Sequence, residues 1–349
     1  AMRWPVSRFA DLAGATKSPI GRLTEELLPT DGPMAAWLGD DGMPLPGLDL
    51  VACVDAILPS MVERDPEWAG WCGMLVTAHD LSAMGARPFA ALDTIGAKDE
   101  ATLARVIRGL KDGSAMFDLP IVGGHTQLGT AGHLTVTGLG RTDFPVPAGG
   151  GRAGDALGLT ADLAGGWRPG YEGRQWDSST SRTREEMREM LGAVAAASPH
   201  AAKDVSMAGI VGTTGMLAEA SGCGAELVVG QLPRPSDARL ADWLTCFPGF
   251  AMVTATEPGA APMPAGPASS ATCGSLTTEP GVRLRWPDGE VTTAIGGPVT
   301  GLGRASADRP TPRSARPSRC TPSTNGTRSA PGPTTTAAGL RPATQESPR

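Results

Sequence analysis

The 349-residue sequence predicts an α/β (α+β) fold in two domains, followed by a disordered tail. Strand-like and helical segments alternate between residues 49 and 141, which predicts a sheet layered with helices. A chain of this length usually divides into two cores. From residue 301 to 349, Pro, Arg, Ser, Thr and Ala dominate and large apolar side chains are almost absent, so this tail is expected to be disordered and dispensable for folding.

The first domain is expected over residues 31–143, after an N-terminal extension at 1–30. Residues 100–116 carry apolar side chains on one helical face, with Asp99 as the expected N-cap. Residues 133–141 alternate in polarity like a strand with one buried face. The predicted elements, in order, are strand 49–56, a helix that carries Asp80, strand 89–95, helix 100–116, a strand at 120–123 that leads into His125, and strand 133–141.

The Pro- and Gly-rich residues 144–151 predict a linker, and the second domain is expected over 152–300. Thr183 and Glu186 have the spacing of a capping box. The predicted elements are a strand within 152–160, helices 183–197 and 210–221, and strands near 225–229, 250–254 and 281–286.

Charge and cysteine usage narrow the class of protein. Residues 301–349 hold eight Arg and two acidic residues, so the preceding 300 residues carry a net charge of −12. This acidic body argues against nucleic acid as the main partner. The six cysteines are scattered without a C-x-x-C pair, which favours a reducing compartment over a disulfide framework.

The sequence also lacks membrane signals. No apolar run approaches the ~20 residues that cross a bilayer. The first residues lack the apolar core of a signal peptide. The prediction is a cytoplasmic protein without a membrane partner.

The most informative segment is Gly73–Pro88, which reads as a largely apolar helix whose one charged residue before Gly85 is Asp80. Gly85 supplies a C-terminal stop for this helix. A carboxylate in so apolar a helix is costly to bury unless it is paired. Two interpretations follow: Asp80 accepts a hydrogen bond from a nearby backbone N–H or serine, or a cation binds against it.

Further carboxylates line up along the chain with Asp80. They are Asp40 and Asp41 in a Gly-Asp-Asp-Gly loop and Asp55 near the end of a strand, and a Gly-Gly-His-Thr segment follows at 123–126. Taken singly, each aspartate is more often a turn or cap residue. As an ordered set of hard oxygen ligands from several loops, they suit Mg²⁺ shared with substrate phosphates.

With these motifs the chain resembles the aminoimidazole ribonucleotide (AIR) synthase superfamily, which also contains thiamine-monophosphate kinase, selenophosphate synthetase and a hydrogenase-maturation dehydratase. There, a Gly-Asp-Asp loop, a strand Asp, an Asn/Ser-Asp-Leu-Ala-Ala-Met-Gly-Ala helix and a Gly-Gly-Asp-Thr turn bind Mg²⁺ and ATP. Asp80–Pro88 is the closest match, and Lys203–Gly209 is similar to the superfamily's Asp-Ile-Ser-Asp-Gly-Gly segment. The resemblance covers roughly residues 30 to 290 and is specific in its combination of motifs.

The resemblance implies an AIR synthase-like architecture, in which the N-terminal domains of two copies pair into a barrel with ATP near the interface. It therefore implies a homodimer that binds ATP, Mg²⁺ and a small-molecule substrate. The implied metal ligands are Asp40, Asp41, Asp55 and Asp80; the implied nucleotide or anion contacts are Gly123, Gly124, Thr126, Gly209 and Gly212, with Lys17 as a further phosphate candidate; the catalytic candidates are His125, Lys203 and Asp204.

Two positions depart from the superfamily's pattern. His125 stands where relatives carry the acid of the Gly-Gly-Asp-Thr turn, and Met207 replaces the second Asp of the later segment. A neutral imidazole can still bind a metal, while a protonated one can bond a phosphate oxygen or act as a general acid. At the helix start, Gly209 and Gly212 can let an anion approach free N–H groups or can serve close packing.

Three functions are consistent with these features. The preferred one is an ATP- and Mg²⁺-dependent enzyme that phosphorylates or phosphate-activates an oxygen of a small molecule. A small-molecule kinase resembling thiamine-monophosphate kinase is favoured by the Ala-Met-Gly-Ala helix and disfavoured by Met207. A non-catalytic nucleotide-binding regulator is favoured by the departures at His125 and Met207. Release of ADP with candidate substrates separates the enzymes from the regulator.

Overall fold

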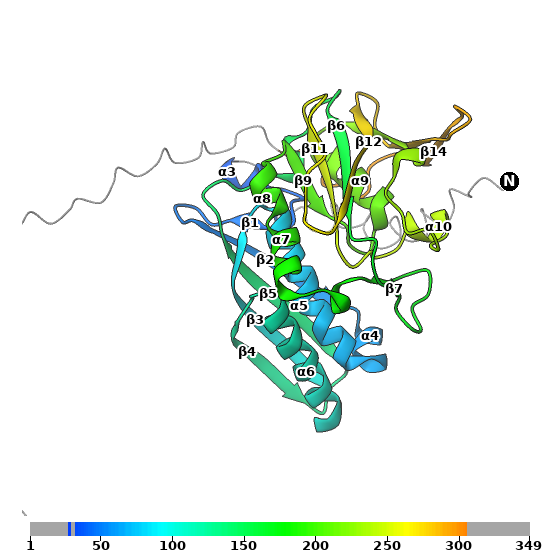
Figure 1. Cartoon of the computed structure of the whole chain (residues 1–349). Coiled ribbons are helices and arrows are strands. Elements are labelled where there is room, and N and C mark those ends of the chain that lie inside the picture. Colours follow the sequence, from blue (N-terminus) through cyan, green and yellow to red (C-terminus); the bar gives the residue numbers. More distant parts are fainter. Residues whose placement is uncertain (1–26, 29–31, 306–349) are drawn as a thin grey trace, which may run out of the picture. The chain divides into compact units, whose positions relative to one another are not determined.

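The first half of the chain is built on a five-stranded sheet with the strand order β1-β2-β5-β3-β4 (Figure 1). The computed structural model describes residues 27–28 and 32–305. β3 and β4 run parallel while the other neighbours pair antiparallel, so the sheet is mixed. Its strands are β1 (Met43–Pro44), β2 (Leu50–Ile57), β3 (Arg87–Ala97), β4 (Ile121–Leu128) and β5 (His133–Arg141).

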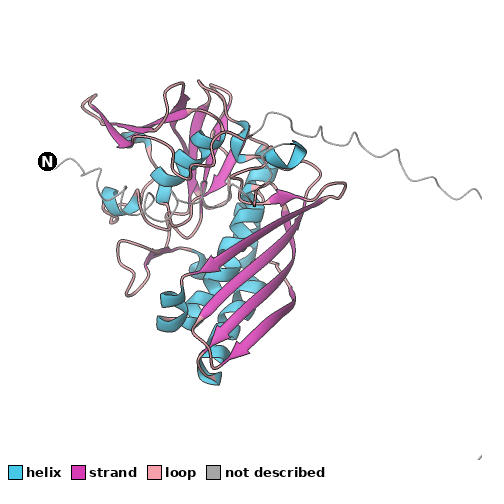
Figure 2. Ribbon diagram, turned by 180° about the vertical axis from the view of Figure 1, so that it is seen from behind, coloured by secondary structure: helices cyan, strands magenta, loops and turns pink. Residues whose placement is uncertain are grey.

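Two long helices, α5 (Pro66–Ala83) and α6 (Glu100–Met116), cover one face of this sheet (Figures 1 and 2). α5 is apolar around most of its circumference because it is buried on both sides. It contacts β2 and β5 within the first half, and β9 and α8 from the second half. The helix ends at Ala83, and the positive φ of 65° at Gly85 turns the chain so that the Ala86 N–H donates to the Leu81 carbonyl at 2.8 Å.

The second half is built on a seven-stranded mixed sheet with the order β14-β13-β10-β12-β6-β11-β9. β10 and β13 are its parallel pair. Helix α9 (Gly209–Ala220) contacts β9, β10, β11 and β13. The strands are β6 (Ala156–Ala161), β9 (Ala201–Asp204), β10 (Gly224–Val228), β11 (Ala251–Thr256), β12 (Ser269–Thr277), β13 (Val282–Arg285) and β14 (Val291–Ile295).

Shorter elements connect these layers. They are α3 (Gly32–Ala35), α4 (Pro59–Arg64), the 3-10 turns η2 (Ala148–Gly150), η3 (Ser179–Ser181) and η4 (Val229–Gln231), the paired strands β7 (Gly166–Trp167) and β8 (Trp176–Asp177), and helices α7 (Arg184–Leu191), α8 (Ala193–Ala197) and α10 (Leu240–Trp243). Among the helices that the structure describes, none is both long enough and apolar enough to cross a membrane.

One hydrophobic core joins the two halves around α5. It combines side chains of the first half with Met187, Met190, Phe247, Phe250 and Met252 of the second. Two hydrogen bonds reinforce the contact: Ser82 Oγ donates to the Leu191 carbonyl at 2.6 Å, and Trp68 Nε1 donates to Gln175 Oε1 at 2.6 Å. This shared core fixes α5 relative to β9, which lies across from it.

Several predicted elements are confirmed, both in their positions and in the residue patterns from which they were predicted. The strand at 133–141 has the predicted bounds, with side chains that alternate between buried and half-buried. Asp99 caps α6 by accepting the Thr102 N–H at 2.7 Å. Thr183 and Glu186 form the predicted capping box at the start of α7. In each case the signal lies within a few residues of the chain and does not depend on tertiary neighbours.

Other expectations are corrected. β4 continues from Ile121 to Leu128, so the Gly-Gly-His-Thr segment is part of a strand and not a turn after it. The helix predicted at 183–197 divides at Gly192 into α7 and α8. The residues predicted as a linker are packed, with Val146 and Ala148 buried.

The predicted start of the disordered tail, at residue 301, is too early in the sequence, because residues 299–305 pack against the end of α9. The Glu219 carboxylate accepts the N–H groups of Val299 at 2.7 Å and Gly303 at 3.1 Å. The Ala305 N–H donates to the Ala220 carbonyl at 3.0 Å, and the Ala305 side chain is buried. Lys17, most of the predicted N-terminal extension and residues 306–349 lie outside the described residues.

A chain that ends after Ala305 is expected to have the full chain's stability, whereas one that ends after Gly297 is expected to lose about 3 kcal/mol or more. The longer truncation removes several hydrogen bonds to a carboxylate, each worth about 1.5–3 kcal/mol, and exposes apolar surface. Urea denaturation of both chains measures the difference. Equal losses in the two chains would mean that residues 306–349 also stabilise the fold.

Candidate metal centre

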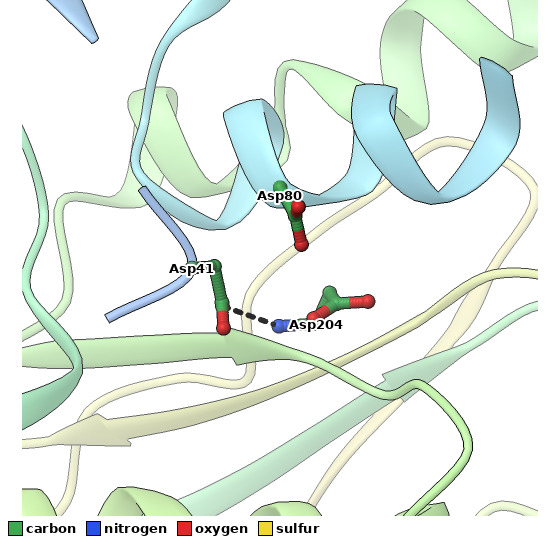
Figure 3. A group of neighbouring side chains, drawn as sticks. All are labelled: Asp41, Asp80 and Asp204. Carbon is green, nitrogen blue, oxygen red and sulfur yellow. Dashed lines mark hydrogen bonds between the residues drawn. The ribbon is translucent and has the colours of Figure 1, made fainter. Parts of the chain in front are cut away.

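Three aspartates from separate elements converge between the two halves (Figure 3). Asp41 lies in the loop after α3, Asp80 on α5, and Asp204 at the end of β9. One carboxylate oxygen from each lies within 4.8 Å of the others. Asp80 and Asp204 are buried, and the Asp41 side chain is only 8% exposed. Such a cluster of buried carboxylates repels itself unless positive charge neutralises it.

Lys203 supplies part of that charge and holds the loop that carries Asp41. Its ammonium group pairs with Asp41 Oδ1 and donates to the Gly39 carbonyl at 3.0 Å. The backbone N–H of Asp204 donates to Asp41 Oδ2 at 3.1 Å. Gly39 has a φ of 81°, which a residue with a side chain rarely adopts. The Asp41 loop is therefore fixed to β9 by both residues at the end of that strand.

The electrostatics of the cluster favour a bound cation. Burial raises the pKa of Asp80 well above its ordinary value, and the carboxylates of Asp55 and Asp204 raise it further. Burial alone would lower the pKa of Lys203, but Asp41 and its acidic neighbours raise it above the ordinary value. The aspartates thus keep the lysine charged, while one ammonium does not neutralise all of them.

The donor set fits a hard divalent ion. Carboxylate oxygens are preferred ligands of Mg²⁺, and two oxygens on opposite sides of one Mg²⁺ are about 4.2 Å apart. Two oxygens on adjacent positions are about 3.0 Å apart, and at most one of the three pairs can lie on opposite sides. The three oxygens, which lie within 4.8 Å of one another, would therefore approach by up to about 1.8 Å to bind one ion. They come from a loop, a helix and a strand end, an arrangement that leaves further coordination positions for water and phosphate.

The two other predicted metal ligands lie at the margin of this cluster. Asp55 is half-buried on β2, and its charge contributes to the raised pKa of Asp80. Asp40 instead accepts the Ala148 N–H at 2.9 Å through Oδ1, so it connects the loop to the packed segment between the two halves.

The structure places Gly123, Gly124, His125 and Thr126 on β4, an edge strand whose residues are largely exposed. β4 lies three strand spacings from β2, a distance of about 14 Å. Within the described residues, His125 is therefore separated from the Asp41–Asp80–Asp204 cluster.

The start of α9 carries two further predicted residues, Gly209 and Gly212. Gly209 has a φ of 64°, and a Cβ there would come within 2.7 Å of the Leu244 carbonyl oxygen. Close packing therefore requires this glycine. Met207, one of the departures from the motif, is 57% exposed just before the helix.

Sequence reasoning assigned no role to His79, which precedes Asp80 on α5. Its side chain is fully buried, and neither ring nitrogen has a hydrogen-bond partner among the described residues. The ring packs edge-on against Phe250, with centroids 5.5 Å apart, and lies near Phe247. Burial lowers the pKa of His79 to about 3. The signal in the sequence was the polar pair His-Asp within an apolar helix, but only the second residue of that pair faces the acidic cluster.

His79 is expected to make the ligand-free fold sensitive to mild acid. Its folded pKa of about 3 lies below the ordinary value of 6.5, so the unfolded chain binds the proton first as the pH falls. The free energy of unfolding should therefore decrease by about 2 kcal/mol between pH 7 and pH 5 through this residue alone. Urea denaturation at both pH values, with His79→Leu as the comparison, measures it. An equally steep loss in the leucine variant would contradict this assignment.

Comparison with known proteins identifies the family. The model for the AIR synthase related protein N-terminal domain matches residues 39–142, and the model for the corresponding C-terminal domain matches residues 152–273. The chain belongs to the AIR synthase-related proteins. The matched ranges contain the three clustered aspartates; the first spans the whole first sheet, and the second ends within β12, before β13 and β14 of the second sheet.

Individual relatives agree with this assignment. An uncharacterized protein from Synechocystis sp. is 33% identical over 231 residues, which cover 64% of this chain and 71% of that protein. Thiamine-monophosphate kinase from Rhodopirellula baltica is 33% identical over 214 residues, covering 58% of this chain and 64% of the kinase. A solved structure described as AaThiL complexed with AMPPCP and TMP aligns with a TM-score of 0.61 at 18% identity over 83% of this chain and 96% of that one. At that identity, the structural likeness establishes a shared fold.

Proposed function

We propose that this AIR synthase-related protein is an ATP- and Mg²⁺-dependent enzyme that phosphorylates or phosphate-activates an oxygen of a small-molecule substrate. The observation that carries the proposal is the buried cluster of Asp41, Asp80 and Asp204, whose oxygens lie within 4.8 Å of one another. Buried carboxylates from three elements match the chemistry of a Mg²⁺ site used with phosphates. The relative described as complexed with AMPPCP supports a nucleotide as the phosphate source.

In this proposal Asp41, Asp80 and Asp204 hold the ion, and Asp55 adds negative charge beside them. A bound Mg²⁺ would neutralise charge on the nucleotide phosphates as the phosphoryl group is transferred. The Lys203 ammonium and the Asp204 N–H keep the Asp41 loop in place. The protein's contribution is thus to position ligands and to balance charge.

Small-molecule kinase chemistry is the leading alternative within this class. It is favoured by the relatives named thiamine-monophosphate kinase, although the chain spans only 64% of the Rhodopirellula enzyme. The two reactions differ in where the phosphate ends. A kinase leaves it on the product, whereas phosphate activation releases it as inorganic phosphate when a nucleophile displaces it.

An assay of ADP release with Mg²⁺, ATP and a panel of hydroxyl- and phosphate-bearing small molecules, thiamine monophosphate included, tests the function. Substrate-dependent ADP release is the expected result. Phosphorus NMR of the products then assigns the phosphate to a product or to free phosphate. Mg²⁺-dependent ATP binding without ADP release for any substrate would favour the non-catalytic regulator instead.

We further propose that the protein acts as a homodimer formed through the first sheet. Among the described residues, no helix covers the face of this sheet opposite α5 and α6 (Figure 2). Val54 is 62%, Leu92 41% and Val122 65% exposed on strands β2, β3 and β4. Exposed apolar side chains on a sheet with a free edge strand are typical of a surface that pairs with another copy. The proposed catalytic role of His125 depends on such a partner, because β4 lies away from the chain's own cluster.

Light scattering at micromolar concentration is expected to give the mass of a dimer, since closed two-fold pairing would cover the exposed strands. Val122→Lys should shift the protein toward monomer because it places charge in the proposed interface. Lys98→Glu, an exposed substitution at the end of β3, serves as the charge-changing control. A monomer at all accessible concentrations would contradict the proposal.

A further inference from the structure

In the part of the chain that the structure describes, Lys203 is the only lysine or arginine that is buried. It lies on β9, pairs with Val253 of β11, and is 3% exposed. A buried lysine usually loses its charge unless acidic groups retain it. Here the ammonium pairs with the Asp41 carboxylate and donates to the Gly39 carbonyl, and Asp204 is the next residue on the same strand. The cluster therefore contains a fixed positive charge before any metal ion binds.

This charge changes what the cluster attracts. When the three carboxylates are ionised, as binding of a metal ion requires, they carry a net charge of −2 with the ammonium and −3 without it. A fixed ammonium beside Asp41 repels a free divalent cation and attracts an anion. A Mg²⁺–nucleotide complex is an anion overall, although the ion within it is positive. The two ligands should therefore respond to Lys203 in opposite directions.

We propose that Lys203 is a specificity-determining residue that weakens the binding of free Mg²⁺ and strengthens the binding of the Mg²⁺–nucleotide complex. The inference rests on the proposed function, because it takes the cluster to be the metal site. Lys203 acts through Asp41 and through its own charge and does not ligate the ion. Because of this selection by Lys203, the ion is expected to enter the site together with the nucleotide phosphates.

The sign of the effect separates this role from two simpler ones. If Lys203 only anchored the Asp41 loop, its removal would misplace the Asp41 carboxylate. The binding of free Mg²⁺ and of the Mg²⁺–nucleotide complex would then both become weaker. If Lys203 only contacted a phosphate, its removal would weaken the nucleotide complex and leave free Mg²⁺ unchanged. A charge that selects between the two forms predicts tighter free Mg²⁺ and weaker Mg²⁺–nucleotide binding in the same variant.

The test is calorimetric titration of the full chain with Mg²⁺ alone, and then with AMPPCP at saturating Mg²⁺. Lys203→Gln keeps a hydrogen-bond donor for the Gly39 carbonyl and removes the charge. We expect this variant to bind Mg²⁺ alone at least tenfold more tightly than the unchanged protein and Mg²⁺–AMPPCP at least tenfold more weakly. Lys98→Gln, which removes a charge at an exposed position, should change neither affinity by more than about twofold.

Lys203→Arg provides the second variant, because it retains the charge with a different geometry. The arginine variant should keep the order of affinities for free Mg²⁺ and Mg²⁺–AMPPCP that the unchanged protein shows. This expectation can be tested even if Lys203→Gln fails to fold. Weaker binding of both ligands in the glutamine variant, or an arginine variant that behaves like the glutamine one, would overturn the inference while leaving the metal site intact. If the unchanged protein bound neither Mg²⁺ nor Mg²⁺–AMPPCP, the proposed function would fail as well.

Discussion

Replacing Asp80 with asparagine is expected to lower Mg²⁺–nucleotide affinity more than tenfold, at least about 1.4 kcal/mol, without destabilising the ligand-free fold. Burial and the neighbouring carboxylates raise the pKa of Asp80 well above its ordinary value, so the ionised side chain destabilises the empty site at neutral pH. Asparagine has nearly the same shape and removes both this unfavourable charge and the ligand that the ion requires. Thermal unfolding with and without Mg²⁺ and AMPPCP measures both effects.

The opposite directions of the two effects make this substitution diagnostic. A residue that merely supports the fold would lower the ligand-free melting temperature when it is changed. Asp112→Asn, on an exposed turn of α6, is the matched control and should leave the ligand-induced shift unchanged. If Asp80→Asn kept the full Mg²⁺-dependent shift, the cluster would not be the metal site. Asp204→Asn should reproduce the loss, because Asp204 provides another of the three clustered oxygens.

The burial of a side chain could be predicted where a single motif determines its surroundings. Asp80 is the one acid in α5 after Glu67 of its first turn, and the structure buries it as the apolar pattern around it implies. Asp40 and Asp41 were harder to separate, because successive loop residues point in different directions. Asp41 faces Lys203, whereas Asp40 accepts the Ala148 N–H. Sequence adjacency alone cannot distinguish two such orientations.

The position of His125 shows that a sequence motif does not predict distances that depend on strand order. The motif groups it with the aspartates, but its distance from them is set by the strand order of the first sheet. Strand order depends on which strands pair across the sheet, and a motif does not specify that pairing. Asp204 shows the converse: it was predicted as a catalytic candidate, and the end of β9 brings it beside Asp41 and Asp80.

The fold was predictable where local signals are strong and less so where tertiary packing decides. The alternation at 133–141 and the caps at Asp99 and Thr183 depend only on residues that are close together in the sequence. β12 was not predicted, although it is central in the second sheet between β6 and β10. Its residues are mainly small and polar, and only Cys273 and Leu276 are buried. It forms a strand because two neighbours supply hydrogen bonds, a feature that its own sequence does not display.

Gly109→Ala is expected to destabilise the protein by about 3 kcal/mol or more, because the added methyl group would overlap the backbone of the neighbouring helix. α5 and α6 cross where Gly70 and Gly109 face each other's backbone. A Cβ at Gly109 would overlap the Glu67 carbonyl oxygen and come within 2.8 Å of the Trp71 nitrogen. Alanine favours a helix by about 1 kcal/mol over glycine, but that gain does not offset backbone overlap. Urea denaturation gives the change in free energy of unfolding.

Gly192→Ala is the matched control for this crossing. Gly192 has an ordinary φ of −81°, and the nearest atom to an added Cβ is the Arg188 carbonyl oxygen at 3.3 Å. Its stability should stay within about 1 kcal/mol of the unchanged protein. Because α5 also carries Asp80, any separation of the helices in Gly109→Ala should move that carboxylate and weaken Mg²⁺–nucleotide binding in the fraction that folds. Equal stability of the two variants would show that α5 and α6 can move apart without a loss of stability. The position of the acidic cluster would then depend only on contacts with the second half of the fold.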